Sequence, residues 1–150
     1  MMLRLLTLVV ATLASFTASA AEHTVQMKNQ GTNGIMVFEP AVLKVAVGDT
    51  VTFEPSDMGH NSQSIPSMSP AGASGWTGGI NQKVTVTIDT EGVYVYKCQP
   101  HLALAMIGVL VAGEATNMDA IMAKVPAMEK ALYSNKDCLL YTSDAADDAS

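Results

Sequence analysis

Hydrophobic and polar residues alternate along several short stretches of the chain between about residues 21 and 112, and Gly, Asp or Pro separates these stretches. In residues 83–88, for example, Val84, Val86 and Ile88 alternate with polar threonines. Because the side chains of a strand point to its two faces in turn, this pattern predicts half-buried β-strands. Many short strands separated by turn residues are typical of an all-β sandwich.

The expected strands share this alternation or are rich in β-branched and aromatic side chains. They cover residues 24–28, 36–39, 41–47, 50–54, 83–88, 93–96 and 107–112. Turns are predicted at residues 31–34, 48–49 and 91–92, where Gly and Asp tolerate the dihedral angles of tight reversals. A stretch rich in Ser, Gly and Pro, residues 62–79, is expected to form a long irregular connection at one end of the sandwich.

Helical periodicity begins only after residue 114. The apolar residues there recur at i, i+3, i+4 and i+7, as a single stripe: Met118, Ile121, Met122 and Val125. Asn117 precedes the stripe and is expected to cap the helix with its side chain. Pro126 suits the first turn of a second helix, over about residues 127–135. The pattern therefore predicts a sandwich followed by two short α-helices, with the methionines packed in the core rather than exposed to capture metal.

Residues 1–20 have the features of a secretory signal peptide. The basic Arg4 is followed by an apolar run over residues 5–14, and Ala18-Ser19-Ala20 provides a small-residue cleavage site. The apolar run is shorter than the roughly 20 residues that a membrane helix needs. We therefore expect export to the periplasm, cleavage after Ala20 and no membrane insertion of the mature protein. The alternative is an uncleaved membrane anchor.

The far end of the chain, residues 138–150, resembles an in-frame translation of a sequencing-library adapter. This segment is therefore expected to be a non-native tail, and the alternative is a genuine acidic, disordered tail. The expected organisation is a signal peptide over residues 1–20, one domain over residues 21–137 and the tail over residues 138–150.

The net charge of the expected mature protein, residues 21–137, does not point to a different class of protein. The full chain has a formal net charge of −6, and residues 21–137 retain 7 basic and 11 acidic residues, which leaves about −4. A mildly acidic body gives no reason to expect nucleic-acid binding. Two cysteines in an exported protein would suggest a disulfide. Cys138, however, lies in the expected tail, and a bridge would consume the thiolate of Cys98, which stands among other candidate metal ligands.

The candidate chemistry lies in one short loop that contains Cys98, His101 and Met106. A thiolate, an imidazole and a thioether are three of the four ligands of a blue-copper electron-transfer site. His60 follows the expected strand 50–54 and is the candidate for the second imidazole. This donor set suits both Cu(I) and Cu(II), so it predicts transfer of one electron with little rearrangement. Since the sequence offers no nucleophile–base pair, phosphate loop or paired carboxylates, we expect no enzymatic activity.

The chain resembles the pseudoazurins, periplasmic cupredoxins with a type 1 blue-copper site. The resemblance extends from residue 21 to about residue 136 and is carried by residues 36–41, 47–53, 59–61 and 92–94, and by Lys97-Cys98, Pro100-His101 and Met106-Ile107-Gly108-Val109. It implies a Greek-key cupredoxin β-sandwich with one copper ion bound by His60, Cys98, His101 and Met106. It also implies a monomeric electron carrier whose redox partner is a nitrite reductase or a c-type cytochrome.

The chain departs from that family in the charges expected around the exposed ligand. Lys97 matches the ring of lysines that pseudoazurins use to dock acidic partners, but uncharged residues stand at other positions where lysines are common: Gln30, Met58, Thr77 and Gly79. We therefore expect docking through an apolar patch around the edge of His101 that includes Leu102 and Leu104.

Three alternatives to this assignment remain open from sequence. An amicyanin- or plastocyanin-like carrier would share the spacing of Cys98, His101 and Met106. A periplasmic copper chaperone would use Met and His without a thiolate, and a structural zinc module would need more Cys and His ligands than this chain has. Within the favoured assignment, Asn61 is expected to tie the His60 loop to the Cys98 loop through side-chain hydrogen bonds.

Overall fold

The computed structural model describes residues 20–133. The expected signal peptide (1–20), apart from its last residue, and the expected tail (138–150) lie outside the described residues. Within residues 20–133, no helix has both the length and the apolar character that crossing a membrane requires.

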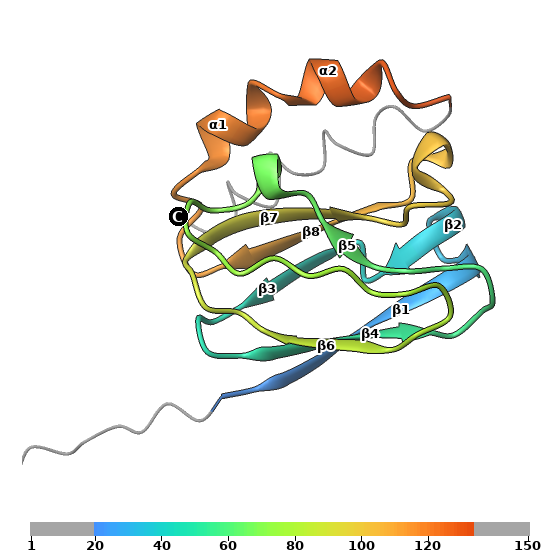
Figure 1. Cartoon of the computed structure of the whole chain (residues 1–150), viewed down its shortest axis with the longest axis horizontal. Coiled ribbons are helices and arrows are strands. Elements are labelled where there is room, and N and C mark those ends of the chain that lie inside the picture. The colour runs from blue at the N-terminus through green and yellow to red at the C-terminus, as the bar shows by residue number, and fades with distance from the viewer. Residues whose placement is uncertain (1–19, 134–150) are drawn as a thin grey trace, which may run out of the picture.

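Two four-stranded sheets pack face to face (Figure 1). The first sheet has the order β2 (Gly34–Glu39), β1 (Glu22–Gly31), β4 (Thr50–Pro55) and β6 (Val84–Thr87). The second has the order β3 (Val42–Val45), β8 (Ile107–Ala112), β7 (Gly92–Lys97) and β5 (Gln63–Ser64). β1 runs parallel to β4 and β3 parallel to β8, whereas the other neighbours are antiparallel. The predicted β-sandwich is confirmed.

The strand predictions were right in number for the long strands and less accurate at their ends. β1 extends beyond the predicted 24–28, because Glu22 and His23 pair with Thr50 and Val51 of β4. The short β5 was not predicted; it lies in the expected irregular connection 62–79, together with the 3₁₀ helix η1 (Pro66–Met68). Both elements are too short to leave a periodic signal in the sequence.

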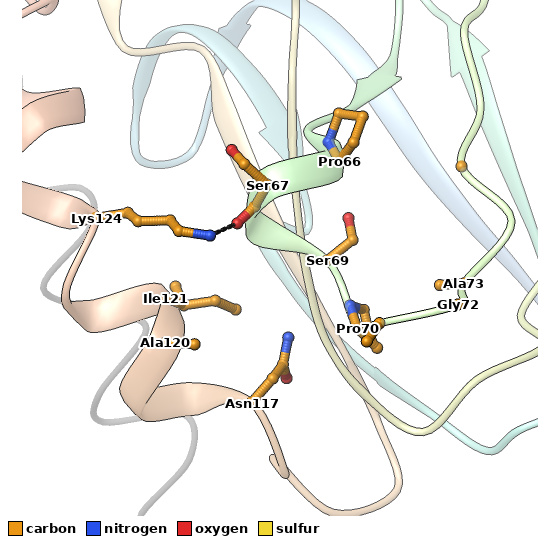
Figure 2. A pocket seen from close by; sticks show the side chains of 12 residues that line it. Pro66, Ser67, Ser69, Pro70, Gly72, Ala73, Asn117, Ala120, Ile121 and Lys124 are labelled. Atoms are coloured by element: carbon orange, nitrogen blue, oxygen red, sulfur yellow. Dashed lines mark hydrogen bonds between the residues drawn. The ribbon is translucent and has the colours of Figure 1, made fainter.

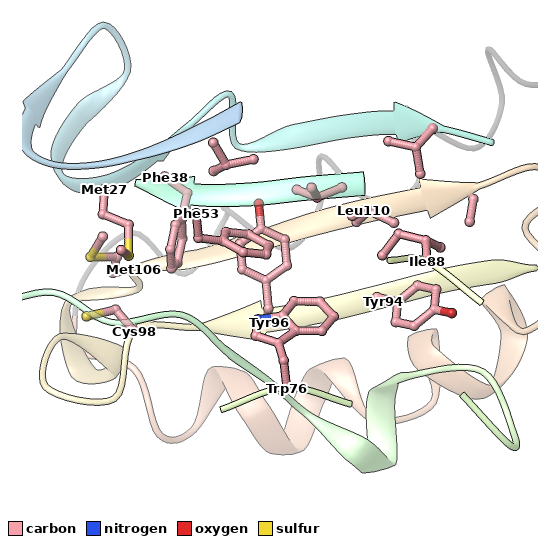
Figure 3. Close-up of a cluster of buried hydrophobic side chains, with 14 residues drawn as sticks. Met27, Phe38, Phe53, Trp76, Ile88, Tyr94, Tyr96, Cys98, Met106 and Leu110 are labelled. Carbon is pink, nitrogen blue, oxygen red and sulfur yellow. The ribbon is translucent and has the colours of Figure 1, made fainter. Parts of the chain in front are cut away.

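Aromatic side chains fill the space between the two sheets (Figure 3). Tyr96 lies at the centre of this cluster, with its ring centroid 4.8 Å from that of Phe38 and 4.9 Å from that of Phe53. A Cβ atom on Gly108 would come within 2.2 Å of the Tyr96 ring, so only glycine fits opposite this tyrosine. Cys98 and Met106 belong to the same buried cluster, which therefore supports the candidate site directly.

The outer face of β7 is covered by the two predicted helices, α1 (Met118–Met122) and α2 (Val125–Glu129). Figure 1 shows both helices above the sheet that contains β7 and β8. Val93 and Val95 of β7 face this second cluster, which also contains Ile121, Val125 and Leu132. The side chains of β7 thus alternate between two buried faces. The second helix, α2, ends at Glu129, earlier than the predicted end at residue 135.

Asn117 lies at the N-cap position of α1, but its side chain makes no capping hydrogen bond. Instead, its Oδ1 accepts a hydrogen bond from the N–H of Val93 (2.7 Å), and its Nδ2 donates one to the carbonyl oxygen of Val93 (2.9 Å). β5 pairs with β7 only at Tyr96 and Lys97, so the edge of β7 at Val93 has no strand beside it. The predicted N-cap position is confirmed, but the side chain binds the edge of β7 instead of the helix, because backbone groups on this edge need partners more than the solvated helix end does.

Candidate metal centre

The structure brings His60, Cys98 and His101 together at one end of the sandwich. Their potential ligand atoms all lie within 4.8 Å of one another. Cys98 Sγ is 3.8 Å from His60 Nδ1 and 3.5 Å from His101 Nδ1, and the two Nδ1 atoms are 3.1 Å apart. His60 follows β4, Cys98 follows β7, and His101 lies in the loop that joins β7 to β8. Two separate connections therefore converge on one point.

The chemistry of these donor atoms fits a copper ion. Two imidazole nitrogens and a sulfur form the strong ligand set of a blue-copper centre, and a soft thiolate favours copper over hard cations such as Mg²⁺ or Ca²⁺. His60 and Cys98 are fully buried, whereas His101 is half-buried. The donor set is thus largely shielded from water, with one ring at its boundary.

Burial controls the protonation of two of these groups. Desolvation lowers the pKa of His60, and the neighbouring His101 lowers it further, so the His60 ring is neutral near pH 7 and able to ligate. Burial raises the pKa of the Cys98 thiol, while the backbone N–H groups of Asn61 and His101 act in the opposite direction. The metal-free protein therefore keeps a thiol, and metal binding must release its proton.

Asn29 orients His60. The Nε2 atom of His60 lies 3.0 Å from Oδ1 of Asn29, which fixes the proton on Nε2 and leaves Nδ1 free as a ligand atom. The backbone N–H of Asn29 donates in turn to Oδ2 of Asp57 (2.7 Å). The pairing of β1 with β2 skips Asn29 and Met36, and Met36 has a left-handed φ of 51°. Sequence analysis missed Asn29, because such an interruption between strands has no clear signature in either strand alone.

Asn61 joins the two connections, as predicted. Its Oδ1 accepts a hydrogen bond from the backbone N–H of Gln99 (2.7 Å), next to Cys98, and its Nδ2 donates to the carbonyl oxygen of Gly78 (3.0 Å). Asn61 is itself buried. This clamp sets the spacing between the His60 and Cys98 connections before any metal binds.

Met106 closes the loop on the side of β8. Its carbonyl oxygen accepts a hydrogen bond from the N–H of Cys98 (3.0 Å), and its N–H donates to the carbonyl oxygen of His101 (3.2 Å). The side chain is fully buried in the inter-sheet cluster. Figure 3 shows Met106 and Cys98 at the same end of that cluster.

A second hollow, of about 420 Å³, lies between the η1 region and α1 (Figure 2). Three of its polar side chains are already engaged within the protein. Lys124 donates to the carbonyl oxygen of Ser67, Ser69 donates to that of Ile65, and Asn117 binds the backbone of β7. This hollow offers no converging ligand atoms, whereas the His60–Cys98–His101 cluster does, within the part of the chain that the structure describes.

A two-sheet β-sandwich with a buried His–Cys–His cluster at one end defines the chain as a cupredoxin. The model of the family "copper binding proteins, plastocyanin/azurin family" matches residues 25–113. Two relatives are pseudoazurins. The one from Paracoccus pantotrophus is 38% identical over 122 residues, which cover 81% of this chain and 83% of the relative. The one from Methylorubrum extorquens is 40% identical over 108 residues, or 72% and 73% of the two chains.

A solved structure of a pseudoazurin from Sinorhizobium meliloti is also similar to this chain. It superimposes with a TM-score of 0.68 at 42% identity, covering 73% of this chain and 91% of the other. The chain belongs to the plastocyanin/azurin family of copper-binding proteins and, within it, to the pseudoazurins. The expected fold and family are confirmed, and the protein is a copper-binding blue-copper electron carrier.

Proposed function

We propose that His60, Cys98, His101 and Met106 bind one copper ion, and that the protein carries single electrons between redox partners without itself being an enzyme. The convergence of His60 Nδ1, Cys98 Sγ and His101 Nδ1 within 4.8 Å is the observation that carries this proposal. Copper, when bound, supplies the one-electron change between Cu(II) and Cu(I). Met106, buried in the same cluster as Cys98, would hold the ion weakly through its thioether sulfur.

The surrounding residues keep the donor atoms in place. Asn29 holds the His60 ring, and Asn61 holds the backbone beside Cys98. Aromatic packing around Tyr96 excludes water from the inner side of the cluster. Because these contacts form within the protein alone, the ligands need not move far when the charge at the site changes, which favours fast electron transfer.

Electrons are proposed to enter and leave through the edge of His101, because the other two clustered ligand residues are fully buried. Exposed apolar side chains lie in the same connections: Met58 next to Gly59 and His60, and Leu104 in the ligand loop. Gly59 itself approaches His101, since a Cβ on it would lie 3.8 Å from Cε1 of that ring. This apolar surface supports short-lived docking of a redox partner.

The proposed redox partner is a nitrite reductase or a c-type cytochrome. The protein is proposed to bind this partner as a monomer in the periplasm. The proposed working unit is residues 21–137, after removal of a signal peptide over residues 1–20. Nothing in the mildly acidic charge of this unit favours nucleic acid as a partner.

Adding Cu(II) to the purified metal-free protein tests the proposal. We expect an intense blue or green colour from charge transfer between the Cys98 thiolate and copper, saturating at one ion per chain. Reduction by ascorbate should bleach the colour, and a c-type cytochrome with a higher potential should restore it. A colourless complex would instead favour a chaperone or a zinc site. Met106→Gln should lower the reduction potential, because an amide oxygen favours Cu(II) over Cu(I), and an unchanged potential would remove Met106 from the ligand set.

A further inference from the structure

Among the hydrogen bonds that attach the C-terminal segment, residues 117–133, to the rest of the protein, three matter here, and one of them is made to the loop that carries the proposed ligands. Asn117 binds the backbone of Val93, and Lys124 binds the carbonyl oxygen of Ser67. The third attachment is a hydrogen bond of 2.8 Å from the backbone N–H of Tyr133 to the carbonyl oxygen of Ala103. The first two lie away from the metal centre, whereas Ala103 lies between His101 and Met106.

The loop between His101 and Met106 is held internally by short-range backbone hydrogen bonds. Its 3₁₀ helix, η2 (Leu102–Leu104), depends on i to i+3 hydrogen bonds, from Leu104 N–H to the His101 carbonyl (3.0 Å) and from Ala105 N–H to the Leu102 carbonyl (2.8 Å). Such turns have poorer hydrogen-bond geometry than α-helices. Ala105 adds strain, because its φ of 64° is left-handed, a conformation that a residue with a Cβ seldom adopts.

Leu132 belongs to the same buried cluster as this strained part of the loop. It is buried, with 3% of its surface exposed, in the same cluster as Ala105 and Ile107. Leu102 and Met128 pack against that cluster from its edge. Residues 102–105 thus lie between two proposed ligands in the sequence, and this cluster and the hydrogen bond from Tyr133 to Ala103 join them to residues just beyond α2.

We propose that Leu132 and the backbone N–H of Tyr133 are positioning groups for the copper-binding loop. They hold residues 102–105 in place, so that His101 and Met106, at the two ends of this stretch, keep their positions. The consequence for copper rests on the proposed function, but the order of the loop can be measured without any metal.

Amide hydrogen exchange in the metal-free protein measures this order at Leu104, Ala105 and Met106, whose N–H groups are all hydrogen-bonded within the loop. In Leu132→Ala we expect exchange at these three amides to accelerate on the order of tenfold, because removing a buried side chain loosens what packs on it. Ile121→Ala is the matched control, since Ile121 is equally buried in the same cluster but lies in α1. It should leave exchange in the loop unchanged.

Two substitutions at Tyr133 separate its backbone from its side chain. Tyr133→Pro removes the N–H that binds Ala103 and should accelerate exchange in the loop. Tyr133→Ala keeps that N–H and removes only a ring that is 87% exposed, so it should have no effect. The proposal would be overturned if Leu132→Ala and Ile121→Ala accelerated exchange in the loop equally. It would also be overturned if Leu132→Ala left exchange unchanged, or if Tyr133→Pro did.

The copper-loaded protein provides the functional readout. Leu132→Ala should shift the charge-transfer spectrum and release copper to a chelator several-fold faster, while Leu132→Met, which restores the volume, should recover both properties. An unchanged spectrum and release rate would show that the segment does not position the ligands. If no variant, including the unaltered protein, formed a coloured copper complex, the proposed function would fail, and the exchange measurements would still decide whether the segment orders the loop.

Discussion

The two ends of the sandwich gather polar groups in opposite ways. At the end away from the metal centre, the carboxylate of Asp49 accepts hydrogen bonds from the backbone N–H groups of Ala21 (2.8 Å) and Ala46 (2.9 Å) and pairs with Nε2 of His23 (2.8 Å). Donors and acceptor match, so the chain completes this end by itself. At the other end, potential ligand atoms of His60, Cys98 and His101 lie within 4.8 Å of one another, the grouping that we propose to bind copper.

The pKa values reflect this difference. Hydrogen bonds from Ala46 and Ala21, and then from His23, lower the pKa of Asp49 from 3.8 to about 2. At the metal centre, burial raises the pKa of the Cys98 thiol, which disfavours its charged form. The charged form of Asp49 at the first end therefore stabilises the fold. At the second end, the thiolate that metal binding needs is disfavoured by burial until a metal is bound. Substitutions at the two ends should consequently affect different properties.

The largest expected effect is that of Cys98→Ser, which removes the sulfur from the metal centre. The visible charge-transfer band should disappear completely, because it arises from the thiolate. The protein should remain folded without metal, because the two buried clusters supply most of the folding free energy. Absorption and circular dichroism measure the two properties, and a surviving band would refute the assignment of Cys98.

The next effect is expected from Asn29→Leu, which takes the hydrogen-bond acceptor away from Nε2 of His60. Copper affinity should fall roughly 10- to 100-fold, as is typical when the partner of a ligating histidine is lost. Asn29→Asp is the matched control, because it keeps an acceptor at the same place. A competition titration with a Cu(I) chelator provides the measurement, and equal affinities for both variants would exclude an orienting role for Asn29.

How far the sequence predicted this molecule depends on the range of each signal. Strand alternation in residues 83–88 is a local pattern, and it was confirmed as β6. The loop around Cys98 and His101 is also a local pattern, and the structure brings both residues together with His60, while their role as ligands stays a prediction. The burial of Val93 was not predictable from alternation, because α1 and α2 cover what would otherwise be a solvent-facing side. Asn29 and the side-chain partner of Asn117 were missed, because each bonds to a residue distant in sequence and neither stands next to a candidate ligand, as Asn61 does.

Asp49→Asn should weaken the fold without changing the copper spectrum. The lowered pKa of Asp49 means that its charged form stabilises the fold above about pH 4 and that this contribution is lost as the pH falls toward 2. Denaturant unfolding of the metal-free proteins should therefore show a less stable variant at pH 7 and converging curves near pH 2 to 3. Glu39, whose pKa is also lowered to about 2, is present in both proteins and cancels in the comparison. A constant difference across this pH range would contradict the account.

The smallest effect is expected from Lys97→Ala, because few charges surround the apolar patch near His101. Electron transfer to a c-type cytochrome should depend weakly on ionic strength, and Leu104→Lys should slow it more than Lys97→Ala does. Stopped-flow rates across a salt series measure both. A steep dependence on salt, with Lys97→Ala as the more damaging change, would indicate electrostatic docking instead.

The loop that supplies Cys98, His101 and Met106 is also the turn of the hairpin formed by β7 and β8. These two strands pair at every position from Gly92 with Ala112 to Lys97 with Ile107, so their register is set by the sheet and by the glycine that faces Tyr96. The register of the two strands therefore does not depend on the residues between His101 and Met106. For protein engineering, this separates two properties within one hairpin: the paired strands hold the register, and the residues between them provide the proposed metal ligands.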